Sequence, residues 1–253
     1  MDFKLTKAQL LQQELFRNFA ETEIKPIAKD MDEAEEYSQE LIAKLQKIGA
    51  FGIPYSREYG GQGADVLTYT LAMEEMSKVD ASTGITLSVH TSLCCACINE
   101  FGTEEQKQEF LRPLVDGHKT GCYGLTEPNA GTDAAGVQTT ADKDGDDYII
   151  NGSKMFTTNS GFADTFVVFA LTDKSKGPRG MSAFVLDRTM PGISVSDNIE
   201  RMGIRAASNC AVTYENVRVP ASRMLGKEGQ GYKIAMTALG GGRIGIGAQS
   251  VGI

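Results

Sequence analysis

Two short runs carry the residue types in this sequence that are best suited to chemistry. The first, residues 123–133, turns at Pro128 and Gly131 and carries hydroxyls at Thr126 and Thr132. Proline and glycine allow a tight turn, and its backbone N–H groups can then face an anionic or heteroaromatic ligand. The run predicts a binding turn, but taken alone it does not identify the ligand.

The second run, residues 153–161, joins the aromatic Phe156 to hydroxyls at Thr157 and Thr158. An aromatic ring can pack against a flat ligand, and hydroxyl groups can donate hydrogen bonds to its edge. The second run therefore predicts residues that could pack against a flat ligand and donate hydrogen bonds to it.

A metal site is the alternative chemistry that the sequence suggests. His90, Cys94 and Cys97 are spaced at i, i+4 and i+7, so one helical face could carry all three. The surrounding stretch 85–98 is almost uncharged, as expected of a buried helix in which free cysteine acts as a small hydrophobic residue. We predict a core helix here and no metal site.

Composition narrows the class of protein. The 253 residues have a formal net charge of −8 and no basic patch, which argues against nucleic acid and anionic membranes as partners. We expect no membrane span, which would need ~20 apolar residues, and residues 1–6 look like neither a signal peptide nor a transit sequence. Five cysteines, an odd number, argue against a disulfide framework and favour a reducing, cytoplasmic location.

The first part of the chain, residues 5–117, has a helical pattern of apolar residues. We expect Pro113 to close its last helix. The cap signals are two capping boxes and two single residues: Thr6 with Gln9, Thr103 with Gln106, Ser38 as an N-cap, and Gly49 as a left-handed stop.

After Lys119 the pattern changes to short β-prone runs separated by turn residues. Because helices do not alternate with them, we predict an antiparallel sheet or barrel and not a Rossmann sheet. The runs are 137–140, 148–150, 165–171, 182–186 and 211–219. A helical pattern returns from Gly229.

We therefore predict an α+β multidomain fold: an N-terminal helical bundle over 1–118, a middle antiparallel β-domain over 119–226, and the start of a C-terminal helical domain over 227–253. The last helix is apolar and rich in glycine, and no partner helix follows it. We expect the chain to be part of a longer protein and to expose apolar surface along residues 234–246, with a tendency to aggregate.

Residues 124–136, Gly-Leu-Thr-Glu-Pro-Asn-Ala-Gly-Thr-Asp-Ala-Ala-Gly, resemble position for position a signature of the acyl-CoA dehydrogenases. The resemblance extends over essentially the whole chain, and it is strongest to short-chain, butyryl-CoA-type enzymes of anaerobic bacteria. It is also carried by 152–159, 202–205, 217–220 and 242–245. It implies FAD as cofactor, an acyl-CoA substrate, an electron-transferring flavoprotein as partner, and a homotetramer.

The resemblance also assigns roles to residues. It places Tyr123, Leu125 and Thr126 along the flavin, with Gly131 allowing close backbone approach. Thr132 would sit between the FAD pyrophosphate and CoA. On the other side of the flavin it places Phe156, Thr157 and Thr158, and the Thr158 hydroxyl would donate to flavin N5.

Arg243 matches a position near bound substrate, although a helix-surface ion pair is a competing role for it. At Gly240 short-chain relatives usually carry an aspartate that contacts the substrate's pantetheine. The loss of that hydrogen bond would cost about 1 kcal/mol of binding free energy.

The implied reaction removes an α-proton of an acyl thioester with a carboxylate base, while the β-hydrogen leaves as hydride. In one branch of the family the base precedes the arginine, where this chain has Gly242. In the short-chain branch it is a glutamate that would lie beyond Ile253. We assign Glu127 to ordering the turn instead.

Two alternatives stay open at this point. One is a flavin oxidase or monooxygenase on the same scaffold. The other is that the chain, taken by itself, is a non-catalytic piece because it lacks the base.

Overall fold

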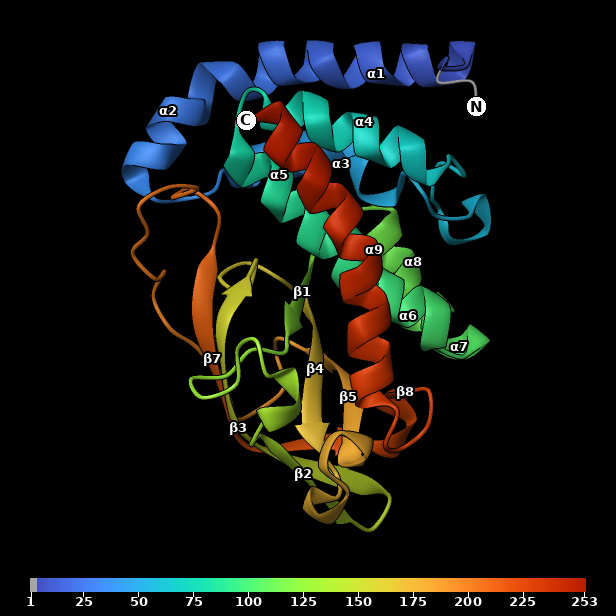
Figure 1. The fold of residues 1–253 in the computed structure, drawn as a ribbon, viewed down its shortest axis with the longest axis vertical. Coiled ribbons are helices and arrows are strands. Elements are labelled where there is room, and N and C mark those ends of the chain that lie inside the picture. Colours follow the sequence, from blue (N-terminus) through green and yellow to red (C-terminus); the bar gives the residue numbers. More distant parts are fainter. Residues whose placement is uncertain (1–3) are drawn as a thin grey trace.

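The computed structural model describes residues 4–253, so the first three residues of the predicted helical region and of the segment assessed for targeting lie outside the described residues. Helices fill the first part of the chain (Figure 1). They are α1 (Lys7–Phe19), α2 (Lys25–Ala34), α3 (Gln39–Lys47), α4 (Val66–Ser77), α5 (Ala81–Ser88), α6 (Ala96–Phe101), α7 (Glu104–Gln106) and α8 (Arg112–Val115).

The predicted helix caps are confirmed. Thr6 and Thr103 each form a complete capping box, and the Ser38 side chain accepts a hydrogen bond from the Leu41 N–H. Gly49 has the left-handed φ of 68° that a helix stop requires.

Pro113 lies near the end of the last helix of this region, as predicted. α7, the π-helical turn η5 (Lys107–Leu111) and α8 follow one another without a break, and α8 ends at Val115. Proline disfavours continuation of a helix, and this one ends two residues after it.

The predicted buried helix over 85–98 forms part of a longer one. α5, the π-helical turn η4 (Val89–Cys95) and α6 run on without a break. By length and composition this helix, Ala81–Phe101, could cross a membrane, contrary to expectation, but 78% of its apolar window is buried inside the protein. Core helices of soluble proteins have the same composition.

Eight strands form the sheet of the middle region. They are β1 (Gly121–Gly124), β2 (Thr140–Asp144), β3 (Asp147–Thr158), β4 (Thr165–Leu171), β5 (Met181–Asp187), β6 (Ile193–Val195), β7 (Asn209–Pro220) and β8 (Met224–Leu225). Their order is β6-β7-β3-β2-β4-β5-β8, with β1 paired to β4.

The sheet is mixed, so the prediction of a purely antiparallel sheet needs correction. β1 runs parallel to β4, and β2 meets β4 in parallel at Thr140. The strand predicted over 137–140 was also misplaced, because the Gln138 and Thr139 N–H groups bond to the Glu127 carboxylate and not to a neighbouring strand.

The central strands β4 and β5 are buried on both faces. Val167 and Val185 pack with the helical region, whereas Phe166 and Phe184 pack in the core on the sheet's other side. Strands covered on both faces read as continuous apolar runs, which explains why these two were predicted well.

Helix α9 (Gly231–Gly252) crosses the other helices and reaches the edge of the sheet (Figure 1). Its glycines bring it close to them: a Cβ at Gly245 would lie 2.6 Å from the Tyr69 hydroxyl. The expectation of exposed apolar surface along residues 234–246 therefore holds only in part. Ile234 is fully buried, although Ile244 and Ile246 are 51% and 40% exposed.

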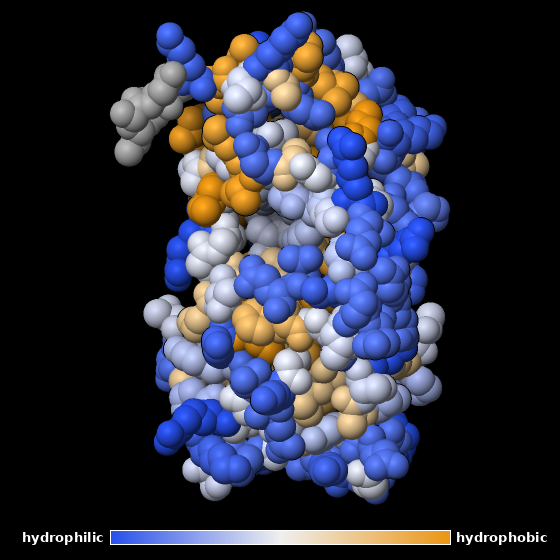
Figure 2. Space-filling view, turned by 90° about the vertical axis from the view of Figure 1, so that its right-hand side faces the viewer, coloured by the Kyte–Doolittle hydropathy of each residue, from blue (hydrophilic) through white to orange (hydrophobic). Residues whose placement is uncertain are grey.

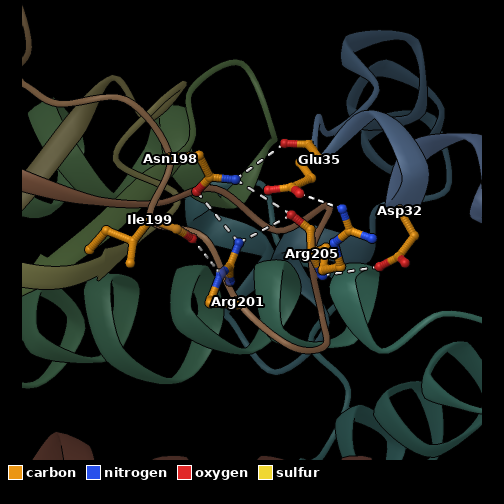
Figure 3. A network of polar contacts seen from close by, with 6 residues as sticks. All are labelled: Asp32, Glu35, Asn198, Ile199, Arg201 and Arg205. Atoms are coloured by element: carbon orange, nitrogen blue, oxygen red, sulfur yellow. Dashed lines mark hydrogen bonds and ion pairs between the residues drawn. The ribbon is translucent and has the colours of Figure 1, made fainter.

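A polar network joins the loop between β6 and β7 to the end of α2 (Figure 3). Arg205 forms an ion pair with Glu35, and the Arg205 N–H donates to Asp32 Oδ1 at 3.1 Å. Asn198 Nδ2 donates to the Glu35 carbonyl at 3.2 Å. Arg201 braces the loop itself by donating to its backbone carbonyls. The network fixes the sheet against the N-terminal helices.

Hydrophobic side chains also gather on the surface, in the upper part of the molecule near α1 and α4 (Figure 2). Several large ones on these helices are exposed: Leu10, Leu11, Leu15, Val66 and Leu67. An exposed patch of this kind is typical of interaction surfaces.

We expect Gly245→Ala to lower the free energy of unfolding by about 1–3 kcal/mol, because the added methyl meets the buried Tyr69 hydroxyl. The matched control is Gly247→Ala, where a Cβ meets no atom within 4 Å. Alanine should stabilise that position by about 0.5–1 kcal/mol through its helix propensity. Urea unfolding measures both variants, and equal stabilisation by the two would contradict the close packing of α9.

Candidate functional site

The first predicted run forms a turn that leaves the end of β1 and is tied to β3. The Met155 N–H donates to the Thr126 carbonyl at 2.7 Å. Glu127 and Ala130 exchange backbone hydrogen bonds of 3.0 and 3.1 Å. A Cβ at Gly131 would meet no atom within 4 Å, so the turn is open to a ligand there.

A buried ion pair holds this turn from beneath. Lys154 Nζ donates to Glu127 Oε1 at 2.6 Å and to the Leu125 carbonyl at 3.2 Å. The Glu127 carboxylate also accepts the N–H groups of Gln138 and Thr139 at 2.5 and 3.0 Å. Glu127 orders the turn, as its sequence context indicated.

The pair is charged at neutral pH. Burial lowers the pKa of Lys154 to about 8, against the opposing effect of Glu127. Burial alone raises the pKa of Glu127, but the Lys154 ammonium and the backbone donors bring it below its ordinary value. Each charge is thus maintained by the other.

The second predicted run lies on β3, where a bulge turns one side chain outward. The pairing of β3 with β7 slips between Lys154 and Thr157, which gives β3 an extra residue. Phe156 sits in this bulge with a left-handed φ of 55° and is 57% exposed. A bulge at this position aims an aromatic side chain out of the sheet.

Thr157 does not join Phe156 and Thr158 at the site. It is 1% exposed, and its Oγ1 has no hydrogen-bond partner among the described residues. Successive side chains of a strand point to opposite faces, so Phe156 and Thr158 share one face and Thr157 takes the other. The sequence prediction had overlooked this alternation.

The turn, β3, η4 and α9 enclose a cavity of about 440 Å³. Eight of the predicted residues line it: Tyr123, Leu125, Thr126, Gly131, Thr132, Phe156, Thr158 and Arg243. Val89 and Leu93 also line it, and they belong to the stretch 85–98 that the family resemblance places along the acyl pocket. Sequence reasoning missed five others: Ala134, Met155, Tyr232, Met236 and Leu239. The structure therefore brings the two runs together, as predicted.

A signal for some of the missed residues was present. Tyr232, Met236, Leu239 and Arg243 follow one another at steps of four, three and four residues, which places them on one face of α9. Apolar stripes usually mark a core, and only the packing of α9 over the sheet shows that this one faces a cavity.

The glycines before Arg243 differ in their surroundings. Gly240 does not line the cavity, and a Cβ there would meet no atom within 4 Å. At Gly242 a Cβ would lie 3.1 Å from Leu93 Cδ2. Arg243 itself lines the cavity and forms no ion pair within residues 4–253, so the competing surface-pair role is not seen.

The residues considered for a metal are packed into the core. His90 Nδ1 accepts the Gly121 N–H at 3.1 Å, and Nε2 lies 3.4 Å from Cys95 Sγ. Within the described residues, no group of three or more His, Cys, Asp or Glu could hold a metal ion. Burial lowers the pKa of His90 to about 3, so the ring is neutral.

Two family models match this chain. The acyl-CoA dehydrogenase N-terminal domain matches residues 6–118, and the acyl-CoA dehydrogenase middle domain matches residues 122–217. The chain belongs to the acyl-CoA dehydrogenase family. The resemblance seen in the two sequence runs is thereby confirmed, as is the fold of helices, sheet and returning helix.

Relatives of this family from anaerobic bacteria are similar over the full chain. The short-chain specific acyl-CoA dehydrogenase of Clostridium acetobutylicum is 54% identical over 253 residues. The butyryl-CoA dehydrogenase structure from Megasphaera elsdenii aligns with a TM-score of 0.97 at 48% identity. All of this chain is covered in both cases, and it spans 67% of either relative.

A chain solved in a study of the electron transferring flavoprotein of Acidaminococcus fermentans aligns with a TM-score of 0.98 at 50% identity. The alignment covers all of this chain and 66% of that one.

Acyl-CoA dehydrogenases are FAD-dependent flavoproteins, and the cavity suits that cofactor. Phe156 and Leu125 offer apolar surface to a flat ring, and hydroxyls at Thr126, Thr132 and Thr158 line the same space. The open backbone at Gly131 allows close approach of a polar chain.

We expect Lys154→Met to lower the free energy of unfolding by about 3–5 kcal/mol, because it leaves the buried Glu127 carboxylate unpaired. The control is Lys29→Met, which removes an exposed pair with Glu33 and should change stability by less than about 1 kcal/mol. Denaturant unfolding tests both. A Lys154→Met chain as stable as the control would show that the pair does not hold the turn.

Stability should also depend on pH through His90. The folded pKa is about 3, below the ordinary 6.5, so between these values the unfolded chain binds a proton that the folded chain excludes. The contribution of His90 to the free energy of unfolding is fully present above pH 6.5. It declines as the pH falls, by about 1 kcal/mol between pH 6 and pH 5.

His90→Asn should remove this part of the slope, because asparagine offers an acceptor to the Gly121 N–H but does not titrate. His118→Asn is the control, since 72% of that side chain is exposed. Unfolding curves at pH 5, 6 and 7 measure the slopes. Identical slopes in the wild-type and His90→Asn chains would refute the assignment.

Proposed function

We propose that the protein catalyses FAD-dependent α,β-dehydrogenation of a short-chain acyl-CoA to the trans-2-enoyl-CoA. One observation carries the proposal: two sequence runs with a flavin-family signature lie side by side and line one cavity, whose other lining residues come from η4 and α9. The short-chain relatives, at 54% and 49% identity, support the substrate class.

The residues that line the cavity have different roles in this reaction. When bound, FAD supplies the acceptor for the hydride that leaves the substrate. Thr158 would donate a hydrogen bond to the bound flavin, and Phe156 would pack against it. On α9, Tyr232 and Met236 line the same cavity and would help to exclude water from it.

The acyl chain enters between η4 and α9. Val89 and Leu93 line this part of the cavity and give it an apolar wall that suits the alkyl part of an acyl group. The short-chain class rests on the relatives.

The residues of this chain that line the cavity do not supply the catalytic base. No Asp or Glu is among the residues that line it. We propose that the base is a glutamate not included in residues 1–253, since this chain spans 67% of the length of its Clostridium relative. The 253-residue chain by itself is then inactive.

The proposal also includes an electron acceptor, a location and an oligomeric state. The electrons pass to an electron-transferring flavoprotein, a partner suggested by the Acidaminococcus structure. The protein is cytoplasmic, and it forms a homotetramer. The exposed Ile244 and Ile246 on α9 are consistent with burial in a larger assembly.

An oxidase is the second candidate function, because the prolyl acyl carrier protein oxidase AnaB aligns with a TM-score of 0.93 at 33% identity. The acryloyl-CoA reductase (NADH) of Anaerotignum propionicum, 42% identical, supports the reverse electron flow on the same residues. Rapid oxygen consumption by the reduced protein would identify the oxidase.

We expect the chain to bind FAD, and Thr158→Val to weaken that binding about fivefold by removing one hydrogen bond. The control is Thr213→Val, on β7 and outside the cavity. Flavin fluorescence measures both affinities. Equal affinities for FAD in the two variants would remove Thr158 from the site.

The substrate is tested by anaerobic addition of butyryl-CoA. The flavin of the longer protein should bleach, and that of the 253-residue chain should not. A longer protein whose flavin stays oxidised would overturn the short-chain assignment, and bleaching of the short chain would overturn the placement of the base.

A further inference from the structure

Asn159 follows directly on the strand that carries Phe156 and Thr158, and it is completely buried. Its backbone has a left-handed φ of 71°. The Asn159 N–H donates to the Ser208 carbonyl at 2.8 Å, and its own carbonyl accepts the Ala163 N–H at 2.7 Å. The backbone therefore holds the side chain in a fixed direction.

The Asn159 amide bridges two other elements. Its Nδ2 donates to the Thr86 carbonyl of α5 at 2.9 Å and to the Gly121 carbonyl of β1 at 3.2 Å. α5 leads into η4, whose Val89 and Leu93 line the cavity. β1 leads to Tyr123, which lines it from another side.

Gly121 extends this bridge to η4. Its N–H donates to His90 Nδ1 at 3.1 Å. A Cβ at Gly121 would lie 2.4 Å from Cys94 Sγ, so no side chain could separate β1 from the helix. Asn159, Gly121 and His90 thus form one buried chain of hydrogen bonds from β3 to η4.

We propose that Asn159 is a positioning residue that sets the separation between the β3 wall and the η4 wall of the cavity. This rests on the proposed function only for the identity of the ligands, a flavin against β3 and an acyl chain against η4. The juxtaposition of the walls is argued from the hydrogen bonds of Asn159 and Gly121, without reference to a ligand.

The location of the bridge explains why a side chain is needed there. A π-helical turn interrupts the regular helical hydrogen bonds, and such turns recur at functional sites. Thr86 stands just before η4, so a donor from another element fixes where the irregular turn begins. In a dry interior these bonds are strong, and unpaired carbonyls would be costly.

The test uses Asn159→Asp, which keeps the shape and the tolerance for left-handed backbone but replaces the N–H donors with acceptors. Hydrogen exchange of the 253-residue chain should become at least about tenfold faster over residues 86–95 and 121–124, which corresponds to about 1.4 kcal/mol of local opening. Asn159→Gly keeps the backbone free of strain and replaces the Asp variant if that one does not fold.

The matched control is Asn151→Asp, on the same strand. Asn151 Oδ1 accepts the Asn216 N–H at 2.8 Å, and a carboxylate can accept it equally. Exchange over 86–95 should stay at the wild-type rate in this variant. If Asn159→Asp also leaves 86–95 at that rate, or speeds exchange uniformly over the chain, the proposal is wrong.

A second readout separates positioning from a purely structural role. In the FAD-loaded chain, the ratio of the dissociation constants for butyryl-CoA and octanoyl-CoA should shift at least about fivefold in Asn159→Asp, because the acyl wall moves. An unchanged ratio with a lowered unfolding midpoint would overturn the proposal. If the wild-type chain binds neither FAD nor acyl-CoA, the proposed function fails, and the exchange experiment still decides the role of Asn159.

Discussion

The cavity depends on one buried ion pair, that between Lys154 and Glu127. The binding turn lies outside the strand ladder, so its backbone must find other partners. Lys154 reaches the Leu125 carbonyl, while Glu127 binds the N–H groups that lead into β2. Because neither charge is tolerated alone in the core, the pair fixes the turn, β2 and β3 together. Phe156 then emerges from the bulge in a defined direction.

Close approach of backbones is the second requirement, and glycine supplies it at two places. Gly121 brings β1 against η4, and Gly245 brings α9 against α4 and α5. The first contact brings β1 close to η4, and the second brings α9 onto the helices that lead into η4. The stripe from Tyr232 to Arg243 on α9 therefore faces a cavity, although its spacing resembles that of an ordinary core stripe.

Much of this arrangement could be predicted from the sequence, because caps and apolar strands are local. Thr6, Ser38 and Thr103 cap helices as predicted, and β4 was predicted with its observed bounds. The parallel pairing of β1 and the packing of α9 could not be predicted, since both depend on contacts between distant segments. The orientation of Thr157 could have been, because strand alternation places it opposite Phe156 and Thr158.

The separate origin of the walls has a consequence for how specificity can change. The residues proposed to face the flavin belong to the turn and β3, whereas Val89 and Leu93, proposed to face the acyl chain, belong to a helix from the N-terminal region. A substitution in η4 can thus change the preference for acyl-chain length without changing the residues of the turn and β3. The exception is the bridge through Asn159 and Gly121, where a change on one wall must move the other. Substitutions of residues that line the cavity can therefore change selectivity for the acyl chain and binding of the cofactor independently. Substitutions of the buried residues Asn159 and Gly121 should change both together.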